Sequence, residues 1–272
     1  MVTAESVGVG RYAREARCYR QDGYLSGMRI IDEAEAAAHR RRLEDAEAVY
    51  GPLHYQAKVH TILRSPLELV TDPRVLDIVE ALIGPNILLW SSTYIIKEPQ
   101  TRGHVSWHQD LTYWGLSGDD QVSMWLALSP ATQANGCMKL APGTHLGGRR
   151  QHRTSEGGSN ILYQGQTVDD VDESAAVFCP LQPGEASFHH GWTLHASPPN
   201  LSDKRRIGLN AQYLATHMRQ TKHERDTAML VRGVDAYGHF GADIPAQGDL
   251  EPQALERHRE LDRLYRETTG HD

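Results

Sequence analysis

The residues in this chain with the clearest chemical potential are two histidines and an aspartate, His108, Asp110 and His195. Because side chains alternate along a strand, His108 and Asp110 would leave an extended segment on the same face and reach one point in space. His195, in a separate strand–loop–strand segment, would complete the set. Two histidines and one carboxylate leave other positions of a metal open, which is typical of non-haem Fe(II) oxygenases. The spacing therefore predicts a metal centre.

The His-x-Asp/Glu pattern is a weak signal by itself. With 15 histidines and 35 acidic residues among 272 positions, about two such triplets are expected by chance. Two occur, and the second, at His258, lies in a charged stretch that indicates a solvated helix. The first precedes residues 119–129, where side chains alternate as they do in a strand. We therefore take His108 and Asp110 as candidate ligands and set His258 aside.

Arg206 lies in a second informative segment, residues 205–213. In a strand, Arg206 would share one face with Gly208, Asn210 and Gln212, and a mostly apolar set would share the other. An arginine in a cavity requires an anionic partner, because an unpaired buried charge is very costly. Guanidinium binds carboxylate through two parallel hydrogen bonds, so we expect a cosubstrate carboxylate there. The alternative is an edge strand with Arg206 in a surface ion pair.

The elements that must position these residues are expected to be helices first and strands afterwards. Helices are expected at residues 32–49 and from Asp72-Pro73 to Gly84, where a capping residue precedes proline and apolar residues recur at helical spacing. Short runs of β-branched and aromatic residues follow. The expected strands are residues 87–97, 121–129, 137–141, 175–179, 185–190 and 205–214. This order predicts an α+β, mainly β, fold built on an antiparallel barrel or sandwich.

The chain length, 272 residues and 30.4 kDa, is sufficient for one large domain. We expect a single domain over residues 1–272. A helical N-terminal segment would reach about residue 86, a β core about residue 215, and a C-terminal tail or flap the end. The segments at residues 147–171 and 216–235 are long enough to be functional loops, although the second could be helical instead. Either one could close over a substrate.

Bulk composition narrows the class of partner and the compartment. The net charge of −7 disfavours a nucleic-acid partner. Three cysteines without a Cys-x-x-Cys spacing disfavour a disulfide framework and fit a reducing compartment. Neither an 18-residue apolar run nor a signal-peptide pattern is present. We therefore expect a cytoplasmic protein with a small-molecule substrate and no membrane contact, of an oligomeric state that the sequence does not indicate.

Four motifs around the candidate residues resemble the phytanoyl-CoA dioxygenase family. The similarity runs in the same order over residues 58–214 and is more specific than any single triplet. Its motifs are Trp107-His108-Gln109-Asp110, Asn135-Gly136-Cys137-Met138, Pro142-Gly143-Thr144-His145 and His195-Ala196-Ser197-Pro198-Pro199-Asn200 followed by Arg206. The resemblance implies a double-stranded β-helix (jelly-roll or cupin-like) core, flanked by N-terminal and C-terminal helices, that binds Fe(II) and 2-oxoglutarate.

The resemblance also implies roles for individual residues. Carried over position by position, His108, Asp110 and His195 would bind the iron, and Arg206 would pair with the far carboxylate of 2-oxoglutarate. The other residues that it places along the 2-oxoglutarate site are Lys58, Thr93, Gln109, Trp125 and Ser197.

The expected activity is hydroxylation of a small metabolite or natural-product intermediate by O₂, with 2-oxoglutarate converted to succinate and CO₂. Related halogenases have a small residue where this chain has Asp110, so a carboxylate disfavours halogenation. Two alternatives stay open: a zinc hydrolase on the same ligands, which has no use for Arg206, and a non-catalytic jelly-roll binding module. Tyr113 and Trp114 follow Asp110 closely and are candidate substrate contacts.

Overall fold

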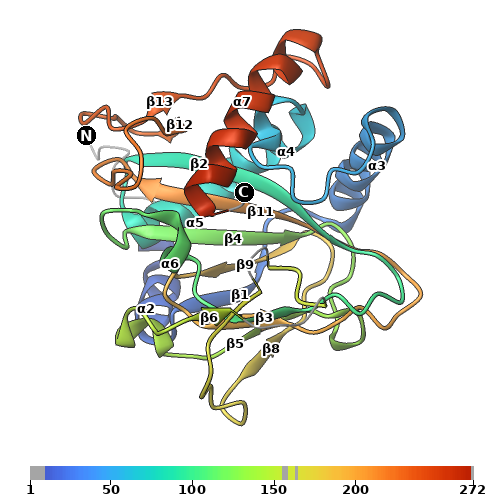
Figure 1. The fold of residues 1–272 in the computed structure, drawn as a ribbon, viewed down its shortest axis with the longest axis vertical. Coiled ribbons are helices and arrows are strands. Elements are labelled where there is room, and N and C mark those ends of the chain that lie inside the picture. Colours follow the sequence, from blue (N-terminus) through green and yellow to red (C-terminus); the bar gives the residue numbers. More distant parts are fainter. Residues whose placement is uncertain (1–9, 155–158, 163–164, 271–272) are drawn as a thin grey trace.

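Two sheets, antiparallel except for one short parallel pair at an edge, form the core of the protein in the computed structural model, which describes residues 10–154, 159–162 and 165–270 (Figure 1). The main sheet has seven strands in the order β1-β9-β4-β11-β2-β12-β13, and the smaller sheet has four in the order β3-β10-β5-β8. The strands of the main sheet are β1 (Tyr24–Arg29), β9 (Glu185–His189), β4 (Gln121–Ala127), β11 (Arg206–Ala215), β2 (Ile87–Lys97), β12 (Thr227–Arg232) and β13 (Gly241–Ala242). Those of the smaller sheet are β3 (Val105–His108), β10 (His195–Ser197), β5 (Met138–Leu140) and β8 (Val177–Cys179). A separate pair joins β6 (Arg153–Thr154) to β7 (Gln166–Thr167).

The described helices lie outside these sheets, as Figure 1 shows for α3 and α7. They are α2 (Ala13–Asp22), α3 (Glu33–Tyr50), α4 (Arg64–Val70), α5 (Pro73–Ile83), α6 (Leu111–Trp114) and α7 (Pro252–Thr269). A capping box starts α3, because Asp32 accepts from the Glu35 amide and Glu35 accepts from the Asp32 amide. Asp72 caps α5 ahead of Pro73, as predicted. None of the described helices is both long enough and apolar enough to cross a bilayer.

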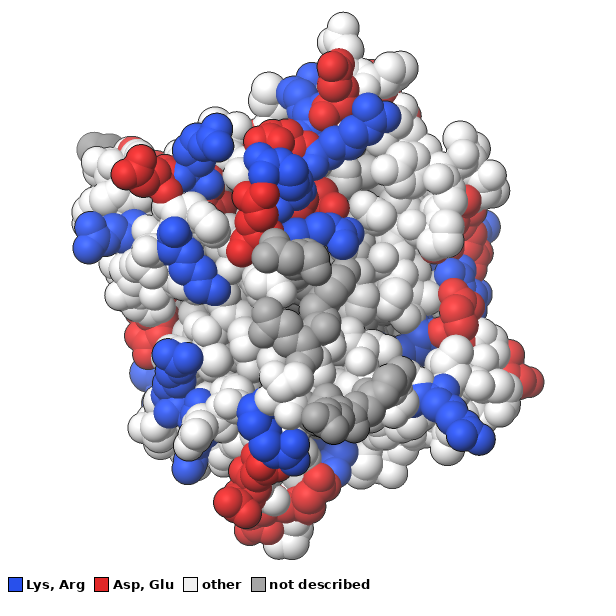
Figure 2. All heavy atoms as spheres, viewed as in Figure 1, with Lys and Arg blue, Asp and Glu red and all other residues white. Residues whose placement is uncertain are grey.

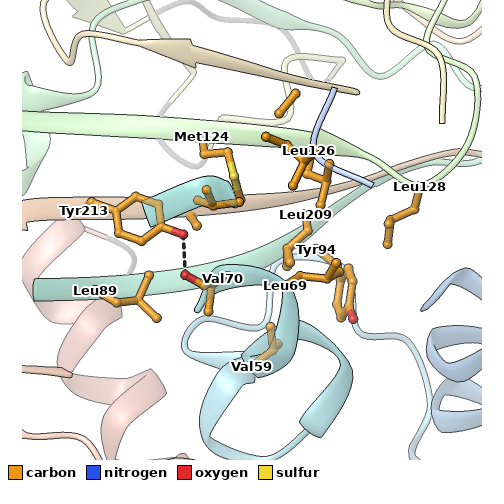
Figure 3. Close-up of a cluster of buried hydrophobic side chains, with 14 of the residues drawn as sticks. Val59, Leu69, Val70, Leu89, Tyr94, Met124, Leu126, Leu128, Leu209 and Tyr213 are labelled. Atoms are coloured by element: carbon orange, nitrogen blue, oxygen red, sulfur yellow. Dashed lines mark hydrogen bonds between the residues drawn. The ribbon is translucent and has the colours of Figure 1, made fainter. Parts of the chain in front are cut away.

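The main hydrophobic core lies between the main sheet and helices α3, α4 and α5. Figure 3 shows part of it, where Leu69 and Val70 of α4 pack against Leu89, Met124 and Leu209. The apolar face of β11 belongs to this core, and its Tyr213 hydroxyl donates to the Val70 carbonyl at 2.8 Å. The opposite, polar face of β11 is therefore directed away from α3, α4 and α5.

The β11 strand adopts the two-faced arrangement that its sequence predicts. The buried Ile207, Leu209 and Ala211 belong to the hydrophobic core, whereas Arg206 and Asn210 line a cavity. The edge-strand alternative is wrong, because β11 pairs with β2 on one side and with β4 on the other. A jelly-roll core with flanking helices is confirmed.

The main sheet extends beyond the expected core range at both edges. β1 pairs with β9, although its residues lie in the segment expected to be helical. β12 pairs with β2, although its residues lie in the segment expected to be a loop. β1 is the edge strand on one side, and β12 lies next to the two-residue edge strand β13 on the other. Both have exposed positions, so neither has the continuous apolar run that identifies a buried strand such as β2.

Candidate metal and cosubstrate site

The two candidate histidine ligands come from neighbouring strands of the smaller sheet. His108 ends β3, His195 begins β10, and the two residues are direct partners in the antiparallel ladder. Asp110 lies beyond the strand, in a helical backbone conformation at the start of α6. It therefore reaches the same point through a turn, and not through the strand alternation that we expected. One ligand atom from each side chain lies within 4.8 Å of the other two.

Each histidine is held so that the same ring nitrogen faces Asp110. His108 Nδ1 lies 2.9 Å from the Ser106 carbonyl oxygen, and His195 Nδ1 lies 3.0 Å from the Thr193 carbonyl oxygen. A carbonyl oxygen only accepts, so Nδ1 is the protonated nitrogen in both rings. The two Nε2 atoms lie 3.4 and 3.7 Å from Asp110 Oδ1. Each Nε2 therefore has a lone pair available for a metal.

The two oxygens of Asp110 have different surroundings. Oδ2 accepts hydrogen bonds from Ser123 Oγ at 3.0 Å and His189 Nε2 at 3.3 Å, which leaves Oδ1 facing the two candidate ligands. Burial opposes ionisation of Asp110, and the two hydrogen bonds that Oδ2 accepts from Ser123 and His189 favour it. An ionised carboxylate with two imidazole nitrogens is a donor set that fits Fe(II).

Arg206 is a buried cation without a matching anion. Its side chain is 3 % exposed, its Nη1 donates to the Gly136 carbonyl at 2.5 Å and to Ser197 Oγ at 3.1 Å, and its Nε has no partner. Within the part of the chain that the structure describes, no carboxylate pairs with it. Burial lowers the pKa of Arg206 to about 10, so the group is still charged at neutral pH. The orphaned guanidinium fits the carboxylate of a bound oxo acid.

Lys97 is a second buried basic side chain, and our sequence reasoning did not assign it to the site. It lies directly opposite Arg206 in the β2–β11 ladder. Its Nζ donates to the Ser197 hydroxyl at 2.6 Å, the Ser197 carbonyl at 3.1 Å and the Pro198 carbonyl. Burial and the neighbouring Arg206 lower the pKa of Lys97 to about 6. No local pattern indicates this placement, because it depends on the register of two strands that are far apart in the sequence.

One cavity of about 170 Å³ brings the candidate ligands together with Arg206. Trp125 and Ser197 line the same cavity, and the Arg206 guanidinium carbon lies 5.0 Å from the centre of the Trp125 ring. Thr93 lines a smaller adjoining cavity. The remaining lining residues of the main cavity are Tyr55, Ile95, Val105, Tyr113, Trp114, Met138, Leu162, Gln166, His189, Ala196, Asn210, Gln212, Tyr265 and Thr269.

Besides Thr93, two more residues that we expected at the 2-oxoglutarate site lie outside this cavity. The Lys58 ammonium donates to Asp243 Oδ2 at 2.7 Å and to the carbonyls of Trp90 and Thr227 at 2.8 and 2.7 Å. Gln109 Nε2 donates to the Gly148 and Trp192 carbonyls. Both side chains are fully buried and committed to other partners. The Lys58 and Gln109 positions thus support neighbouring chain segments instead of facing the cavity.

The C-terminal helix α7 supplies part of the cavity wall, which we had not expected of a solvated helix. Tyr265 and Thr269 line the cavity, and the Tyr265 ring centre lies 5.1 Å from that of Trp90. His258 is buried and its Nε2 lies 2.6 Å from the Ala57 carbonyl oxygen, so it anchors the helix. In the sequence, the signal for this contact was Tyr265, an aromatic residue among charged neighbours.

The Trp125 ring packs directly against the backbone at Gly208, and this packing keeps the ring beside Arg206. Gly208 lies in β11, and a Cβ added there would lie 2.1 Å from the Trp125 ring. We expect Gly208→Ala to displace the ring, to lower the free energy of unfolding by about 1–3 kcal/mol as other overpacked sites do, and to weaken 2-oxoglutarate binding. Urea unfolding and a 2-oxoglutarate titration measure both effects. A variant that keeps wild-type affinity would show that the Trp125 ring does not support Arg206.

A jelly-roll with two histidines, one carboxylate and an unpaired buried guanidinium in one cavity defines the class of non-haem iron oxygenases that use an oxo-acid cosubstrate. The family model for phytanoyl-CoA dioxygenase matches residues 19–208. The chain belongs to this family.

Individual relatives agree with this assignment. A probable phytanoyl-CoA dioxygenase of Caenorhabditis elegans is 27% identical over 234 residues, which cover 74% of each chain. The peroxisomal phytanoyl-CoA dioxygenase of Bos taurus is 32% identical over 150 residues, 53% of this chain and 44% of that protein. The second match therefore spans less than half of the bovine relative.

Solved structures show the same fold. The non-heme monooxygenase ThoJ, in its apo form, is 31% identical with a TM-score of 0.79, covering 93% of this chain and 98% of that chain. CytC3 with Fe(II) and alpha-ketoglutarate is 25% identical with a TM-score of 0.62, covering 83% of this chain and 90% of that chain.

Proposed function

We propose that this protein hydroxylates a small molecule in the cytoplasm, with Fe(II) bound by His108, Asp110 and His195 and with 2-oxoglutarate bound by Arg206. The observation that carries the proposal is the unpaired, buried Arg206 guanidinium in the cavity that holds the three ligand atoms. A zinc hydrolase would gain nothing from such a cation. The three cysteines, Cys18, Cys137 and Cys179, are unpaired, which supports a reducing compartment.

Bound iron would supply the activation of O₂, and the protein supplies ligand geometry and a shielded pocket. The proposed reaction converts a substrate C–H group, O₂ and 2-oxoglutarate into C–OH, succinate and CO₂. One oxygen atom enters the C–H bond and the other enters succinate. The Asp110 carboxylate fills a ligand position in this scheme, which disfavours halogenation.

Arg206, Trp125 and Ser197 would hold the cosubstrate. The guanidinium would pair with the carboxylate at the far end of 2-oxoglutarate, and Ser197 Oγ, 3.1 Å from Arg206 Nη1, would offer a hydroxyl beside it. The Trp125 ring under the guanidinium limits its movement. These contacts orient the oxo-acid end toward the three ligand atoms.

The rest of the cavity wall would hold the substrate. Tyr113 and Trp114 lie on α6, beside Asp110, and Tyr265 lies on α7. Ile95, Val105 and Leu162 add apolar surface. An apolar, aromatic wall favours a substrate whose reacting carbon is hydrophobic and excludes water from it.

The test is optical and independent of the substrate. Under anaerobic conditions, protein with Fe(II) and 2-oxoglutarate should show a weak visible charge-transfer band, and Zn(II) in place of Fe(II) should not produce it. Air should then convert 2-oxoglutarate to succinate. A folded protein that binds Fe(II) but gives neither the band nor succinate would overturn the proposal.

Lys97 predicts a pH dependence of 2-oxoglutarate affinity. Its pKa of about 6 reflects burial first and Arg206 second, with the Cys137 thiol acting in the opposite direction. A bound dicarboxylate favours the protonated amine, so binding takes up a proton, and affinity should fall as the pH rises above 6. Carboxylates of this type are ionised throughout pH 6–9 and contribute no slope of their own.

Dissociation constants measured from pH 6 to 9 for wild type and Lys97→Met check this expectation. The difference between the two profiles isolates Lys97 from the histidines, which both proteins share. The wild type should lose affinity with rising pH more steeply than the variant. Parallel profiles would contradict the assignment of Lys97 to the cosubstrate site.

A further inference from the structure

A second, open groove of about 500 Å³ adjoins the candidate active site. Tyr113 and Gln166 line both the groove and the main cavity, so the two spaces share a wall. The other residues that line the groove are Thr112, Arg149, Arg150, Gln151, His152, Arg153 and Thr154. Among its described lining residues are three arginines and no carboxylate.

The charge of this groove contrasts with that of the molecule. The chain has a net charge of −7, and on the face in Figure 2 acidic and basic side chains are intermixed, as along α7. In the groove, Arg153 is paired with Asp169. Arg149 and Arg150 are exposed, and neither forms an ion pair with any described residue. Two cations are therefore available to an anion from solution.

Arg149 lines the groove together with Tyr113, which also lines the cavity. Its guanidinium acts electrostatically on Tyr113, whose phenol pKa is raised by burial, and on Lys222, whose pKa is lowered by burial and by Arg149 itself. The Lys222 ammonium donates to the Tyr113 carbonyl. The Tyr113 hydroxyl is buried and has no hydrogen-bond partner among the described residues. The positive charge is thus concentrated beside a side chain of the active-site wall.

Gln109 connects the loop at residues 148–153, which we call the arginine loop, to the candidate metal site. Its Nε2 donates to the Gly148 carbonyl at 2.8 Å, and its Oε1 accepts from the Arg150 amide at 2.7 Å. The backbone amide of Gln109 donates to His152 Nε2 at 3.0 Å. Gln109 lies between two candidate iron ligands in the sequence, so these hydrogen bonds hold the loop at a defined position relative to the candidate ligands.

We propose that the groove formed by Arg149 and Arg150 beside Tyr113 binds an oxyanion of the substrate, a phosphate or a carboxylate, while the carbon to be oxidised enters the apolar cavity. This assignment rests on the proposed function and specifies its substrate class as an anionic small molecule. Paired guanidinium groups suit both oxyanions. Gln109 is a positioning residue for this groove.

Isothermal titration calorimetry of the metal-free, full-length protein tests the groove without turnover. Pyrophosphate and, separately, tricarballylate are titrated into wild type, Arg149→Gln/Arg150→Gln and Arg206→Gln. The double variant should bind the preferred anion at least about tenfold more weakly than wild type, whereas Arg206→Gln should bind it within about twofold. Preference for pyrophosphate would assign a phosphate, and preference for tricarballylate a carboxylate.

Arg14→Gln/Arg41→Gln is the matched control, because it removes two exposed arginines, on α2 and α3, that form no ion pair with any described residue. It should retain wild-type affinity, and thermal unfolding verifies that every variant is folded. The proposal is overturned if wild type binds neither anion, if only Arg206→Gln loses binding, or if the control loses as much as the double variant. Because no step needs catalysis, absence of succinate formation would refute the oxygenase proposal separately.

Discussion

Replacement of His195 by alanine is expected to lower succinate formation from 2-oxoglutarate by at least about a thousandfold, since the metal loses one of its three protein ligands. The Fe(II) content of the purified protein should fall from about one equivalent to near zero. His195 is buried, with Nδ1 bound to a carbonyl, so the substitution removes a preoriented Nε2 donor. Metal analysis and a succinate assay measure the two effects.

His217→Ala is the control for this experiment. His217 is half-exposed and pairs with Asp120 on the surface, and it does not line the cavity. The control should keep its iron and its rate within about twofold, as surface substitutions generally do. A His195→Ala variant that retained both iron and succinate formation would remove His195 from the ligand set.

Replacement of Arg206 by glutamine should raise the dissociation constant of 2-oxoglutarate roughly 100-fold, because breaking a buried charge pair costs about 3 kcal/mol. The same change should leave the unliganded protein as stable as wild type or more stable, because it removes an unpaired buried cation. Anaerobic titration with 2-oxoglutarate and thermal unfolding without it measure the two quantities. This opposite behaviour separates a binding role from a purely structural one.

Arg205→Gln is the neighbouring control. Arg205 points away from the cavity and pairs with Glu47 at 2.9 Å and with Glu98 at 2.8 Å. Its loss should weaken the fold slightly and leave 2-oxoglutarate affinity unchanged. If both arginine variants lose affinity equally, the effect arises from the strand as a whole, and Arg206 is not the carboxylate partner.

The parts of the fold that depend on local sequence patterns could be predicted from the sequence. The strand expected at residues 87–97 is β2, Ile87–Lys97, and the alternation in β11 distinguishes its cavity face from its core face. Burial on both faces of a central strand leaves a strong apolar signal. Residue type and spacing predicted the convergence of His108, Asp110 and His195, and the structure brings their ligand atoms together, although Asp110 arrives through a turn and not through strand alternation.

Residues whose roles depend on long-range packing could not be placed in this way. Lys58 meets Asp243 across 185 positions, and no local pattern indicates that pair. Gln109 has the expected neighbours in sequence, but its side chain turns toward the arginine loop. Tyr265 reaches the cavity only because α7 is anchored on the segment around Ala57. The role of a residue depends on its neighbours in space, and the neighbours of these three side chains come from segments that are remote in the sequence.

Because α7 packs over the cavity, the residues that shape the substrate space and the residues that hold iron and 2-oxoglutarate lie in different elements. The proposed iron and 2-oxoglutarate contacts come from strands and from the short turn after β3, whose geometry tolerates little variation. Tyr265 and Thr269 shape the same chamber from one surface helix near the end of the chain. Substitutions in that helix can change the shape of the substrate-binding part of the cavity without altering the proposed iron and 2-oxoglutarate contacts. A library of variants confined to α7 is therefore a route to altered substrate selectivity.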